Sequence, residues 1–207
     1  MSVVIPLPDI SYAGGLDLKS AIYERSSVRR FTSRQIALGA VADLLWSAQG
    51  HIRTGKRAVP SAGATYPLQM LLAVADNGVE GLSSGLYQYN HHYDVDRHSL
   101  QLLHDQSVMG EVAEACFGQT CVKEAMALIA VVSDNSRTAK RYGERAERYV
   151  AMEAGHVGQN VSLMALSLGL GAVMVGAFKD DEVARALRLQ DGLRPYYVIP
   201  VGHPYSE

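Results

Sequence analysis

The hydrophobic and polar positions of this chain fall into two repeating patterns. Amphipathic helices are predicted where apolar residues recur every three or four positions, at 17–25, 38–49, 107–117, 136–168 and 180–189. Strands are predicted where apolar residues run continuously or alternate with polar ones, at 68–75, 85–94, 99–104, 125–132, 172–178 and 195–201. Asp17 and Asp180 are the expected N-caps, and Gly50 is expected to end the second helix in a left-handed conformation.

The order of these elements predicts the fold class. Strands and helices do not alternate strictly, as they would in a doubly wound parallel sheet. The pattern therefore predicts an α+β fold in which helices flank one central sheet, with 85–94 and 99–104 paired as a hairpin. The chain has 207 residues, 48% of them hydrophobic, so residues 1–207 are expected to form a single domain with a substantial core.

The most apolar predicted helix, 149–168, favours a second copy of the chain. Its apolar side chains are spread around most of the helix circumference: Met152, Val157, Val161, Leu163, Met164 and Leu166. A helix that is apolar on nearly every side must be buried on nearly every side, and a chain of this length has little structure with which to bury it. A homodimer is therefore expected. Gly143, Gly155 and Gly158 interrupt the longer helical pattern and predict a bend or a break.

Charge, cysteines and the N-terminus exclude several partners. The 19 Lys and Arg against 21 Asp and Glu give a net charge of −2, without the basic excess of a nucleic-acid-binding protein. The uncharged stretch 161–178 contains three glycines in its second half, so it is interpreted as a buried helix, a turn and a strand, and not as a membrane span. Cys116 and Cys121 are expected to be reduced thiols, and residues 1–10 do not resemble a signal peptide, so a cytoplasmic location is expected.

Two short segments carry candidate ligand contacts. The segment 25–31 reads RSSVRRF, and its arginines and hydroxyls could bind a phosphate in bidentate fashion. The same charges would equally suit a solvated helix end, where cations complement the helix dipole. The segment 59–67 reads VPSAGATYP, and its small residues let the backbone approach a flat ligand, although ordinary loops have the same composition. Both interpretations stay open for each segment.

Other familiar constellations do not match. A G-x-G lies just before Met174, but a dinucleotide fingerprint needs a third glycine at that position and a strand before the turn. Glu153 and His156 form a single E-x-x-H, whereas a di-iron bundle needs two such motifs, and His156 is expected to be buried and hydrogen-bonded instead. His91 and His92 lie in a predicted strand, where neighbours face opposite sides. No metal site is expected.

Taken in order, the segments resemble the FMN-dependent nitroreductase superfamily. The similar stretches are RSSVRRF at 25–31, PSAGATYP at 60–67, EAGHVGQNVSLMALSLGLGAVMVGAF at 153–178 and VIPVGHP at 198–204. The resemblance covers nearly the whole chain. It implies a three-layer α/β/α sandwich with a central mixed, mainly antiparallel sheet, in a domain-intertwined homodimer that holds two FMN molecules at its interface.

The resemblance also implies roles for individual residues. The phosphate, ribityl chain or ring edge of FMN would be held by Arg25, Ser26, Ser27 and Arg29. The partner subunit would bring to the flavin Pro60, Ser61, Ala62 and Gly63. Val175 and Gly176 would lie by the flavin ring with a backbone N–H near N5, where such a donor favours the reduced flavin. Family members often have a basic residue near the C-terminus that meets the phosphate, and only His203 occupies that region here.

One branch of the superfamily, the azoline dehydrogenases that oxidise thiazoline or oxazoline rings in modified peptides, is particularly similar. The shared stretches are PSAGATYPL at 60–68 and RTAKRYGER at 137–145. In that branch a Lys-Tyr pair assists proton removal, and the aligned pair here is Arg141 and Tyr142. Arginine cannot readily lose its proton, so Tyr142 is the candidate base and Arg141 its neighbour.

Three functions follow from the resemblance. The first is an FMN oxidoreductase that passes a hydride through flavin N5, from NAD(P)H to a nitroaromatic or quinone-type acceptor. The second is an azoline dehydrogenase that acts on a modified peptide and uses oxygen to recycle FMN. The third is a flavin-binding or scaffold subunit without turnover of its own, which the missing basic C-terminal residue favours. The substrate would accordingly be a small molecule or a peptide.

Overall fold

The computed structural model describes residues 3–91 and 98–205, which form a seven-stranded sheet in the order β1-β4-β3-β2-β5-β7-β6. The strands are β1 Val4–Pro6, β2 Leu68–Val74, β3 Gly85–His91, β4 His98–His104, β5 Ala127–Asp134, β6 Gly171–Ala172 and β7 Leu193–Gly202. Every ladder between these strands is antiparallel. The predicted α+β class, the mainly antiparallel sheet and the hairpin of β3 with β4 are confirmed.

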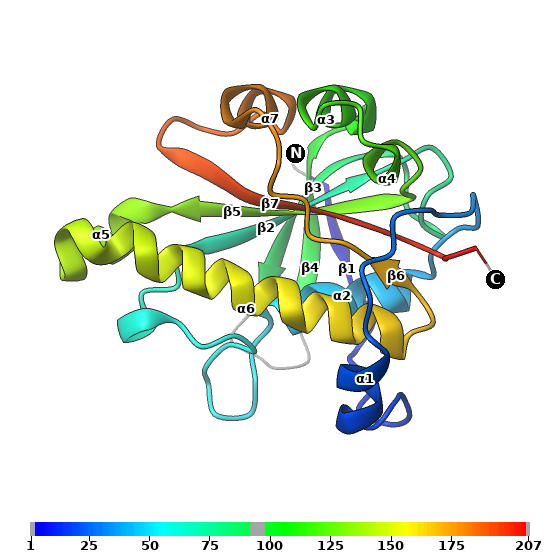
Figure 1. Cartoon of the computed structure of the whole chain (residues 1–207), viewed down its shortest axis with the longest axis horizontal. Helices are drawn as coiled ribbons and strands as arrows, with labels where there is room; N and C mark the ends of the chain where they lie inside the picture. The colour runs from blue at the N-terminus through cyan, green and yellow to red at the C-terminus, as the bar shows by residue number, and fades with distance from the viewer. Residues whose placement is uncertain (1–2, 92–97, 206–207) are drawn as a thin grey trace.

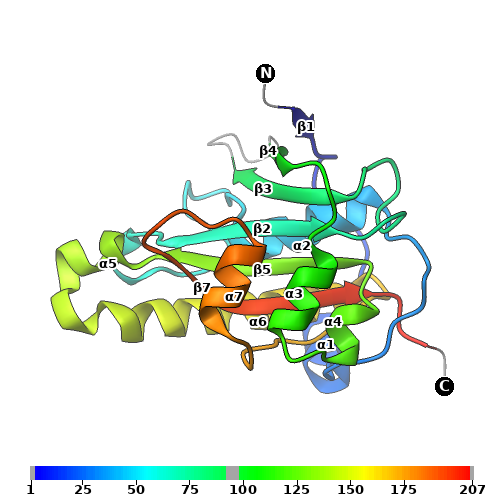
Figure 2. The same ribbon diagram turned by 90° about the horizontal axis from the view of Figure 1, so that it is seen from above.

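Helices cover both faces of this sheet, as the expected three-layer sandwich requires. The α-helices are α1 Leu18–Glu24, α2 Leu38–Gln49, α3 Met109–Ala115, α4 Thr120–Lys123, α5 Asn135–Tyr142, α6 Ala146–Ser167 and α7 Asp180–Ala186. Figure 1 shows α3, α4 and α7 above the sheet, with α2 and α6 below it and α1 packed against the far end of α6. Viewed from above, α3 and α7 lie across the strands in Figure 2.

The two layers enclose two separate hydrophobic cores. Side chains of a strand alternate between its faces, so β2 contributes to both. Met70 and Leu72 pack in the core beneath α2 and α6, whereas Leu71 and Ala73 pack in the core beneath α3 and α7. Burial on both faces explains why β2 has a continuous apolar run and not an alternating one.

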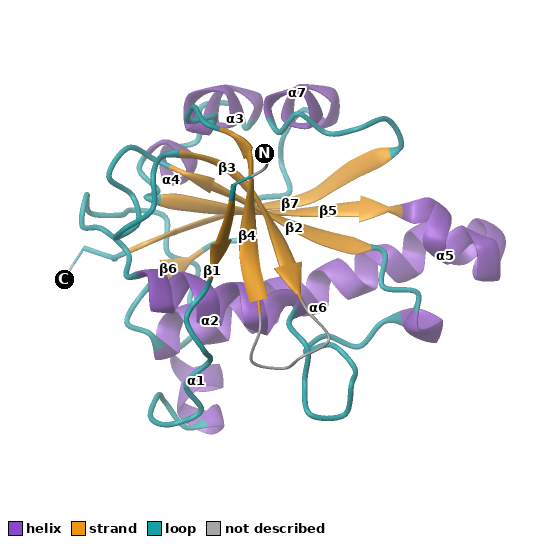
Figure 3. Cartoon of the chain, turned by 180° about the vertical axis from the view of Figure 1, so that it is seen from behind, coloured by secondary structure: helices purple, strands orange, loops and turns teal. Residues whose placement is uncertain are grey.

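The long predicted helix 136–168 is divided at Gly143. This glycine has φ 54° and ψ −131°, a conformation that residues with a side chain rarely adopt. A 3₁₀ turn, Gly143–Arg145, follows, and α6 begins at Ala146. The interruption that the glycine pattern predicted is therefore a complete break, which sets α5 at an angle to α6 at the end of the molecule (Figure 3).

Several element boundaries differ from the prediction. The strand expected at 172–178 is reduced to β6 and a single bridge between Val175 and Val198. The helix expected at 107–117 is only α3, because Phe117 has a positive φ of 57°. Asp180 is not the N-cap of α7 but lies in its first turn, and Lys179 occupies the N-cap position without a side-chain hydrogen bond to the helix. Residues 92–94 of the strand predicted at 85–94 lie outside the described residues.

Gly50 ends α2 for a different reason from the expected one. Its φ is −66° and its ψ is 160°, so it is extended and not left-handed. A Cβ at this position would collide with the Trp46 side chain, which packs against the Gly50 backbone. Close packing, and not backbone freedom, therefore requires glycine here. Asp17, in contrast, caps α1 as predicted by accepting hydrogen bonds from the N–H groups of Lys19 and Ser20.

The apolar face of α1 is the clearest exception to burial. Ala21 is buried, but the side chains of Leu18 and Ile22 are 68% and 57% exposed. On α6, Val157 and Val161 are buried, whereas Met152 is 51% exposed. A single chain thus leaves apolar surface of both helices uncovered, although it covers most of α6.

Candidate active site

The arginine- and serine-rich segment after α1 lies directly against β6. The backbone N–H of Val28 donates to the carbonyl oxygen of Ala172 across 3.1 Å. A Cβ built on Gly171 would lie 2.6 Å from the Val28 side chain, so glycine is what permits this approach. Two of the motifs that the sequence analysis singled out, 25–29 and 171–176, are therefore neighbours.

The donor groups of this segment are not used inside the chain. Arg25 is half-buried, and Ser26 and Ser27 are exposed. In residues 3–91 and 98–205 none of these three side chains makes a hydrogen bond or ion pair, and the Arg29 guanidinium donates only a long bond of 3.4 Å to the Ser27 carbonyl. This set of two guanidinium groups and two hydroxyls fits a phosphate ligand.

Arg30, next to Arg29 in the sequence, differs from it because its guanidinium is already bound to an acidic side chain. Its Nε donates to the Glu124 carboxylate across 2.9 Å, and its guanidinium lies 5.6 Å from the centre of the Tyr205 ring. The hydrogen bond to Glu124 raises the pKa of Arg30 and lowers that of Glu124. Arg30 is thus paired within the chain. It offers a natural control for Arg29.

The backbone near Val175 and Gly176 offers one donor and not two. The Val175 N–H donates to the carbonyl oxygen of Val198 across 2.9 Å, so this donor belongs to the sheet. Gly176 is exposed, and its N–H has no acceptor within the part of the chain that the structure describes. Of the two residues predicted to place a backbone N–H near flavin N5, only Gly176 therefore has an N–H available for a ligand.

The other predicted contacts lie in the loop around the short 3₁₀ helix Ala62–Ala64, beside α5. Arg141 Nη1 donates to the Gly63 carbonyl oxygen across 3.1 Å. Gly63 has a φ of 59°, and a Cβ built there would lie 2.6 Å from the Tyr142 hydroxyl. The tertiary structure therefore brings Arg141, Tyr142 and Gly63 together, as a phenol and a guanidinium at the surface of a small-residue loop.

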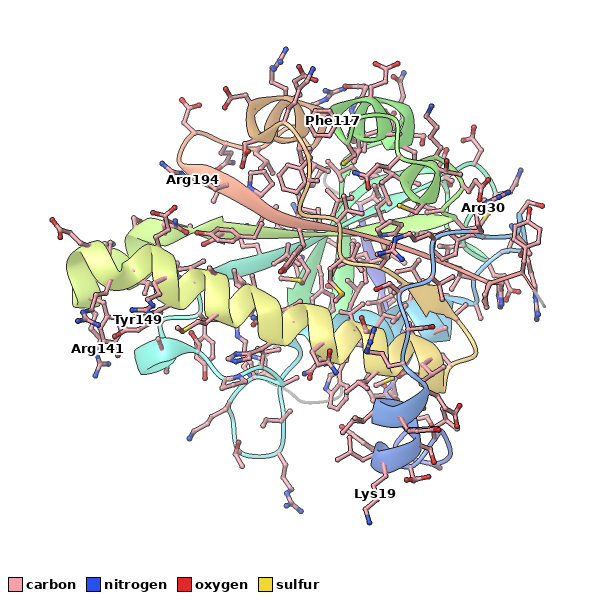
Figure 4. The ribbon with its side chains drawn as sticks, in the orientation of Figure 1. Lys19, Arg30, Phe117, Arg141, Tyr149 and Arg194 are labelled. Carbon is pink, nitrogen blue, oxygen red and sulfur yellow. The ribbon has the colours of Figure 1, made fainter. Side chains whose placement is uncertain are left out.

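The Tyr142 ring is held on its other side by α6. It packs edge-on against Tyr149, with ring centroids 5.0 Å apart and planes at 83°. The Arg141 guanidinium lies 5.5 Å from the centre of the Tyr142 ring. These contacts orient the phenol beside the loop, at the end of the molecule where Figure 4 labels Arg141 and Tyr149.

A buried acid lies beneath this loop. The Glu153 side chain is 2% exposed, receives a bond of 3.5 Å from Gln49 Nε2 and is hydrogen-bonded by Ser61. Ser61 Oγ also accepts from the Tyr66 N–H across 2.9 Å. Burial raises the pKa of the Glu153 carboxyl. The sequence analysis treated Glu153 only as a possible metal ligand, although a charged residue on the inner face of an apolar helix is itself an unusual feature.

His156, the other half of that E-x-x-H, is exposed, so the prediction that it is buried is wrong. Among residues 3–91 and 98–205, no group of three or more His, Cys, Asp or Glu could hold a metal ion, and no helix could cross a membrane. His92 lies outside the described residues.

Cys116 and Cys121 are free and buried, and burial raises the pKa of the Cys116 thiol to about 11.

The two groups of candidate residues lie at opposite ends of α6. This helix has 22 residues, so at a rise of 1.5 Å per residue it is about 33 Å long. Glu153 and Ser61 lie towards its start, whereas Ser167 near its end accepts from the Leu16 N–H just before α1. In Figure 4, Arg141 and Lys19 mark the two ends. Within one chain, the 60–63 loop does not reach the 25–29 segment.

Comparison with known proteins decides the family. The model of the Nitroreductase family matches residues 22–203. The chain belongs to the nitroreductase family. A nitroreductase homologue of Methanocaldococcus jannaschii is 40% identical over 199 residues, which are 96% of this chain and 95% of that protein. Proteins of this family are oxidoreductases that generally bind flavin.

Solved structures and a further relative extend the comparison. A nitroreductase homologue from Anabaena variabilis has a TM-score of 0.83 and 27% identity over 99% of this chain, which spans 42% of the Anabaena chain. A chain of the E. coli microcin synthetase complex with truncated pro-MccB17 bound has the same fold, with a TM-score of 0.73 at 20% identity over 95% of this chain and 76% of that chain. The trifolitoxin-processing protein of Rhizobium leguminosarum is 32% identical over 127 residues, 56% of this chain and 31% of that protein.

Proposed function

We propose that this nitroreductase-family protein binds FMN and uses NAD(P)H to reduce nitroaromatic or quinone-type acceptors. Bound FMN would supply N5, the atom that accepts and donates the hydride. The observation that carries the proposal is the unused donor set of Arg25, Ser26, Ser27 and Arg29, together with the free N–H of Gly176 further along the same 171–176 segment. The two free, buried cysteines suit a reducing compartment, so we place the protein in the cytoplasm.

The residues of the chain would bind and orient the cofactor. Arg25 and Arg29 would hold the phosphate by bidentate bonds, to which the Ser26 and Ser27 hydroxyls add donors. The Gly176 N–H would donate to the ring at the position where negative charge develops. No basic residue near the C-terminus is needed for this scheme, because the guanidinium groups of Arg25 and Arg29 would already bind the phosphate. His203 instead lies 3.2 Å from the Gln35 carbonyl oxygen.

We further propose that the protein is a homodimer in which each site takes residues from both subunits. Pro60, Ser61, Ala62 and Gly63 would approach the flavin held by the partner subunit. The support is the separation of the two residue groups by most of the length of α6. The exposed apolar face of α1 supplies surface for such an interface, since exposed patches of this kind mark association sites.

The first experiment is a measurement of the cofactor followed by turnover. We expect the purified protein to be yellow and to release about one FMN per chain on heating. The loaded protein is then mixed with NADH or NADPH and a nitroaromatic acceptor, and oxidation of the nicotinamide is followed by absorbance. A protein that holds FMN but turns over no nitroaromatic or quinone would contradict the reductase. A protein that refuses added FMN would favour the scaffold function.

The azoline-dehydrogenase alternative is favoured by the contact of Arg141 and Tyr142 with Gly63. The phenolic oxygen of Tyr142 lies at the surface of the loop that would face the partner's flavin, where its deprotonated form would accept a substrate proton. The microcin synthetase chain that shares this fold was solved with truncated pro-MccB17 bound, and one relative by sequence is a trifolitoxin-processing protein, which agrees with a peptide substrate. Oxidation of the ring would transfer a hydride to the bound FMN and a proton to the phenolate form of Tyr142, which becomes the neutral phenol, and oxygen would take the two electrons from the flavin.

Replacement of Tyr142 by Phe distinguishes the two proposed activities, azoline oxidation and nitro reduction. The substitution removes the hydroxyl and keeps the ring that packs on Tyr149. Azoline oxidation is expected to be lost, whereas NAD(P)H-driven nitro reduction is expected to change by less than about threefold, because it needs no base at this position. Equal losses in both reactions would argue against a specific proton-accepting role for Tyr142.

A further inference from the structure

Phe117, in the turn between α3 and α4, combines an unfavourable backbone conformation with an exposed aromatic ring. Its φ is 57°, in the left-handed region that a bulky residue rarely adopts, and the residue is 62% exposed. The next residue, Gly118, also has a positive φ, 66°, but glycine adopts it without steric conflict. Since an exposed ring buries little apolar surface, burial does not compensate for the strain at Phe117.

Other large side chains on a positive φ are held by contacts within the chain. The Tyr66 ring is half-buried and lies 4.7 Å from the Arg57 guanidinium, and Arg188 binds both carboxylate oxygens of Glu111 across 2.8 Å. The Phe117 ring, in contrast, stacks on no aromatic ring or cation within residues 3–91 and 98–205. Strained residues without such a contact are concentrated at ligand-binding sites, where the ligand supplies the contact.

The turn is fixed against the chain that leads from β6 to α7. Gln119 Nε2 donates to the carbonyl oxygen of Cys116 and to that of Ala177, each across 3.0 Å. One nitrogen atom therefore links the residue before Phe117 to the residue after Gly176. Figure 4 labels Phe117 beside α3 and α7. The exposed ring thus lies near the free N–H that was assigned to the flavin.

Helix α4 joins this turn to the arginine-rich segment 25–31. Glu124, at the C-terminal end of α4, accepts hydrogen bonds from Arg30 Nε across 2.9 Å and from the Phe31 N–H across 3.3 Å. The other end of α4 begins at the turn that contacts the chain after Gly176. Because α4 has only four residues, it is about 6 Å long. The two groups that we assigned to FMN therefore lie at the two ends of one short helix.

We propose that Phe117 binds the acceptor of the reductase, with its ring packed on the flat ring of a nitroaromatic or quinone beside the flavin. Aromatic rings attract one another in offset and edge-to-face arrangements, and a ring on a fixed turn adopts them without rearrangement of the backbone. The inference rests on the proposed function for its location, because FMN held by Arg29 and Gly176 would extend along α4. The exposed ring is then available to a ligand that arrives from solvent.

The test combines direct binding with turnover. The dissociation constant of 4-nitrobenzamide is measured by calorimetry on the FMN-loaded protein. With NADH as donor, kcat/KM for 4-nitrobenzamide is divided by kcat/KM for ferricyanide, a compact acceptor without an aromatic ring. Phe117→Leu keeps an apolar side chain on the same backbone but removes the flat ring, whereas Phe117→Tyr keeps the ring. Leu103→Ala is the control, because it shortens an exposed apolar side chain on β4, near the opposite edge of the sheet from β6.

We expect Phe117→Leu to weaken 4-nitrobenzamide binding and to lower the kcat/KM ratio by about fivefold or more, the usual value of an aromatic pair. Phe117→Tyr and Leu103→Ala should retain both values. Unchanged values in Phe117→Leu, or equal losses in the Leu and Tyr variants, would overturn the contact. Weaker FMN binding or loss of the dimer in Phe117→Leu would overturn it as well, because the ring would then contact the cofactor or the partner subunit.

Phe117→Asn tests the strain separately, since asparagine tolerates a positive φ better than other residues with side chains. We expect this variant to unfold at a higher urea concentration than the natural chain and to bind 4-nitrobenzamide as weakly as Phe117→Leu. A less stable variant would show that the ring is held by packing within the chain, against the proposal. If the natural chain binds 4-nitrobenzamide but does not reduce it, the proposed reductase fails and calorimetry on the variants decides the contact. Absence of binding would overturn the contact itself.

Discussion

Arg141 Nη1 donates to the carbonyl oxygen of Gly63 across 3.1 Å, and this bond links α5 to the loop that the family resemblance assigns to the flavin. The same glycine has a positive φ and lies against the Tyr142 hydroxyl. The side chains at the end of α5 and the shape of the loop are therefore coupled. A substitution at Gly63 is therefore expected to shift the side chains of Arg141 and Tyr142, and a substitution of either side chain is expected to alter the loop.

Gly63→Ala tests this coupling. The left-handed backbone would cost about 1 kcal/mol with alanine, and the new Cβ would displace Tyr142 and Arg141. Gly55→Ala is the matched control, because Gly55 also has a positive φ but has nothing within 4 Å of its Cβ position. We expect Gly63→Ala to lose at least as much stability in urea unfolding as Gly55→Ala, and only Gly63→Ala to lower FMN affinity. Unchanged FMN affinity in Gly63→Ala would separate the loop from the cofactor.

Substitutions of the neighbouring residues Arg29 and Arg30 are expected to affect FMN binding differently. Arg29→Gln removes a guanidinium that is not committed to any acidic group, and a lost charge-assisted bond of about 1.5–3 kcal/mol would weaken FMN binding by about tenfold or more. Arg30→Gln breaks only the exposed pair with Glu124, which is worth less than about 1 kcal/mol. The dissociation constant of FMN, measured by fluorescence titration, distinguishes them. Equal constants for the two variants would contradict the phosphate assignment.

The exposed face of α1 predicts the oligomeric state. Leu18→Glu places a charge on a side chain that is 68% exposed in the single chain and would be buried in the proposed dimer. Sedimentation velocity is expected to show a dimer for the natural chain and mainly monomer for this variant, with loss of bound FMN. Leu103→Glu is the control, since Leu103 is 44% exposed on β4, away from α1 and α6. A monomeric natural protein that still holds FMN would refute the shared site.

Glu153 predicts a pH-dependent stability. Burial raises the pKa of its carboxyl above the ordinary value of 4.5, so the folded protein holds this proton more tightly than the unfolded chain does. The stabilising contribution is therefore complete below pH 4.5 and is lost as the pH rises through the raised value. Each unit of difference between the folded and unfolded pKa corresponds to about 1.4 kcal/mol.

Glu153→Gln is accordingly expected to be more stable than the natural chain at pH 8, with the advantage shrinking as the pH approaches 4. The free energy of unfolding in urea, measured across this range, checks the sign. Glu114→Gln provides the baseline, because Glu114 is an exposed acid on α3. An advantage that is constant with pH would show that the pKa of Glu153 is not raised in the folded protein. A variant that is less stable at pH 8 would show that the hydrogen bonds from Ser61 and Gln49 outweigh the cost of burying the charge.

The local spacing of apolar and polar residues was sufficient to predict most of the helices and strands. Helix α2, strand β2 and the β3–β4 hairpin lie where periodicity predicted them, because apolar spacing reports which face of a short segment is buried. Capping of α1 by Asp17 is equally local, since it needs only neighbouring N–H groups. The motifs that led to the nitroreductase family were likewise recognisable as short stretches in the right order.

Only the tertiary structure decided the hydrogen bonding and burial of residues whose neighbours in space are far away in the sequence. The bond from the Val175 N–H to the Val198 carbonyl oxygen uses this donor within the sheet and leaves the Gly176 N–H free, which no local pattern reveals. Burial of Glu153 and exposure of His156, three residues apart, follow from where α2 and the 60–66 loop pack on α6. The sequence by itself determined the elements and the family. Long-range packing determined which polar groups are used up within the chain and which remain for a ligand, because a hydrogen-bond partner far along the sequence is chosen by the fold.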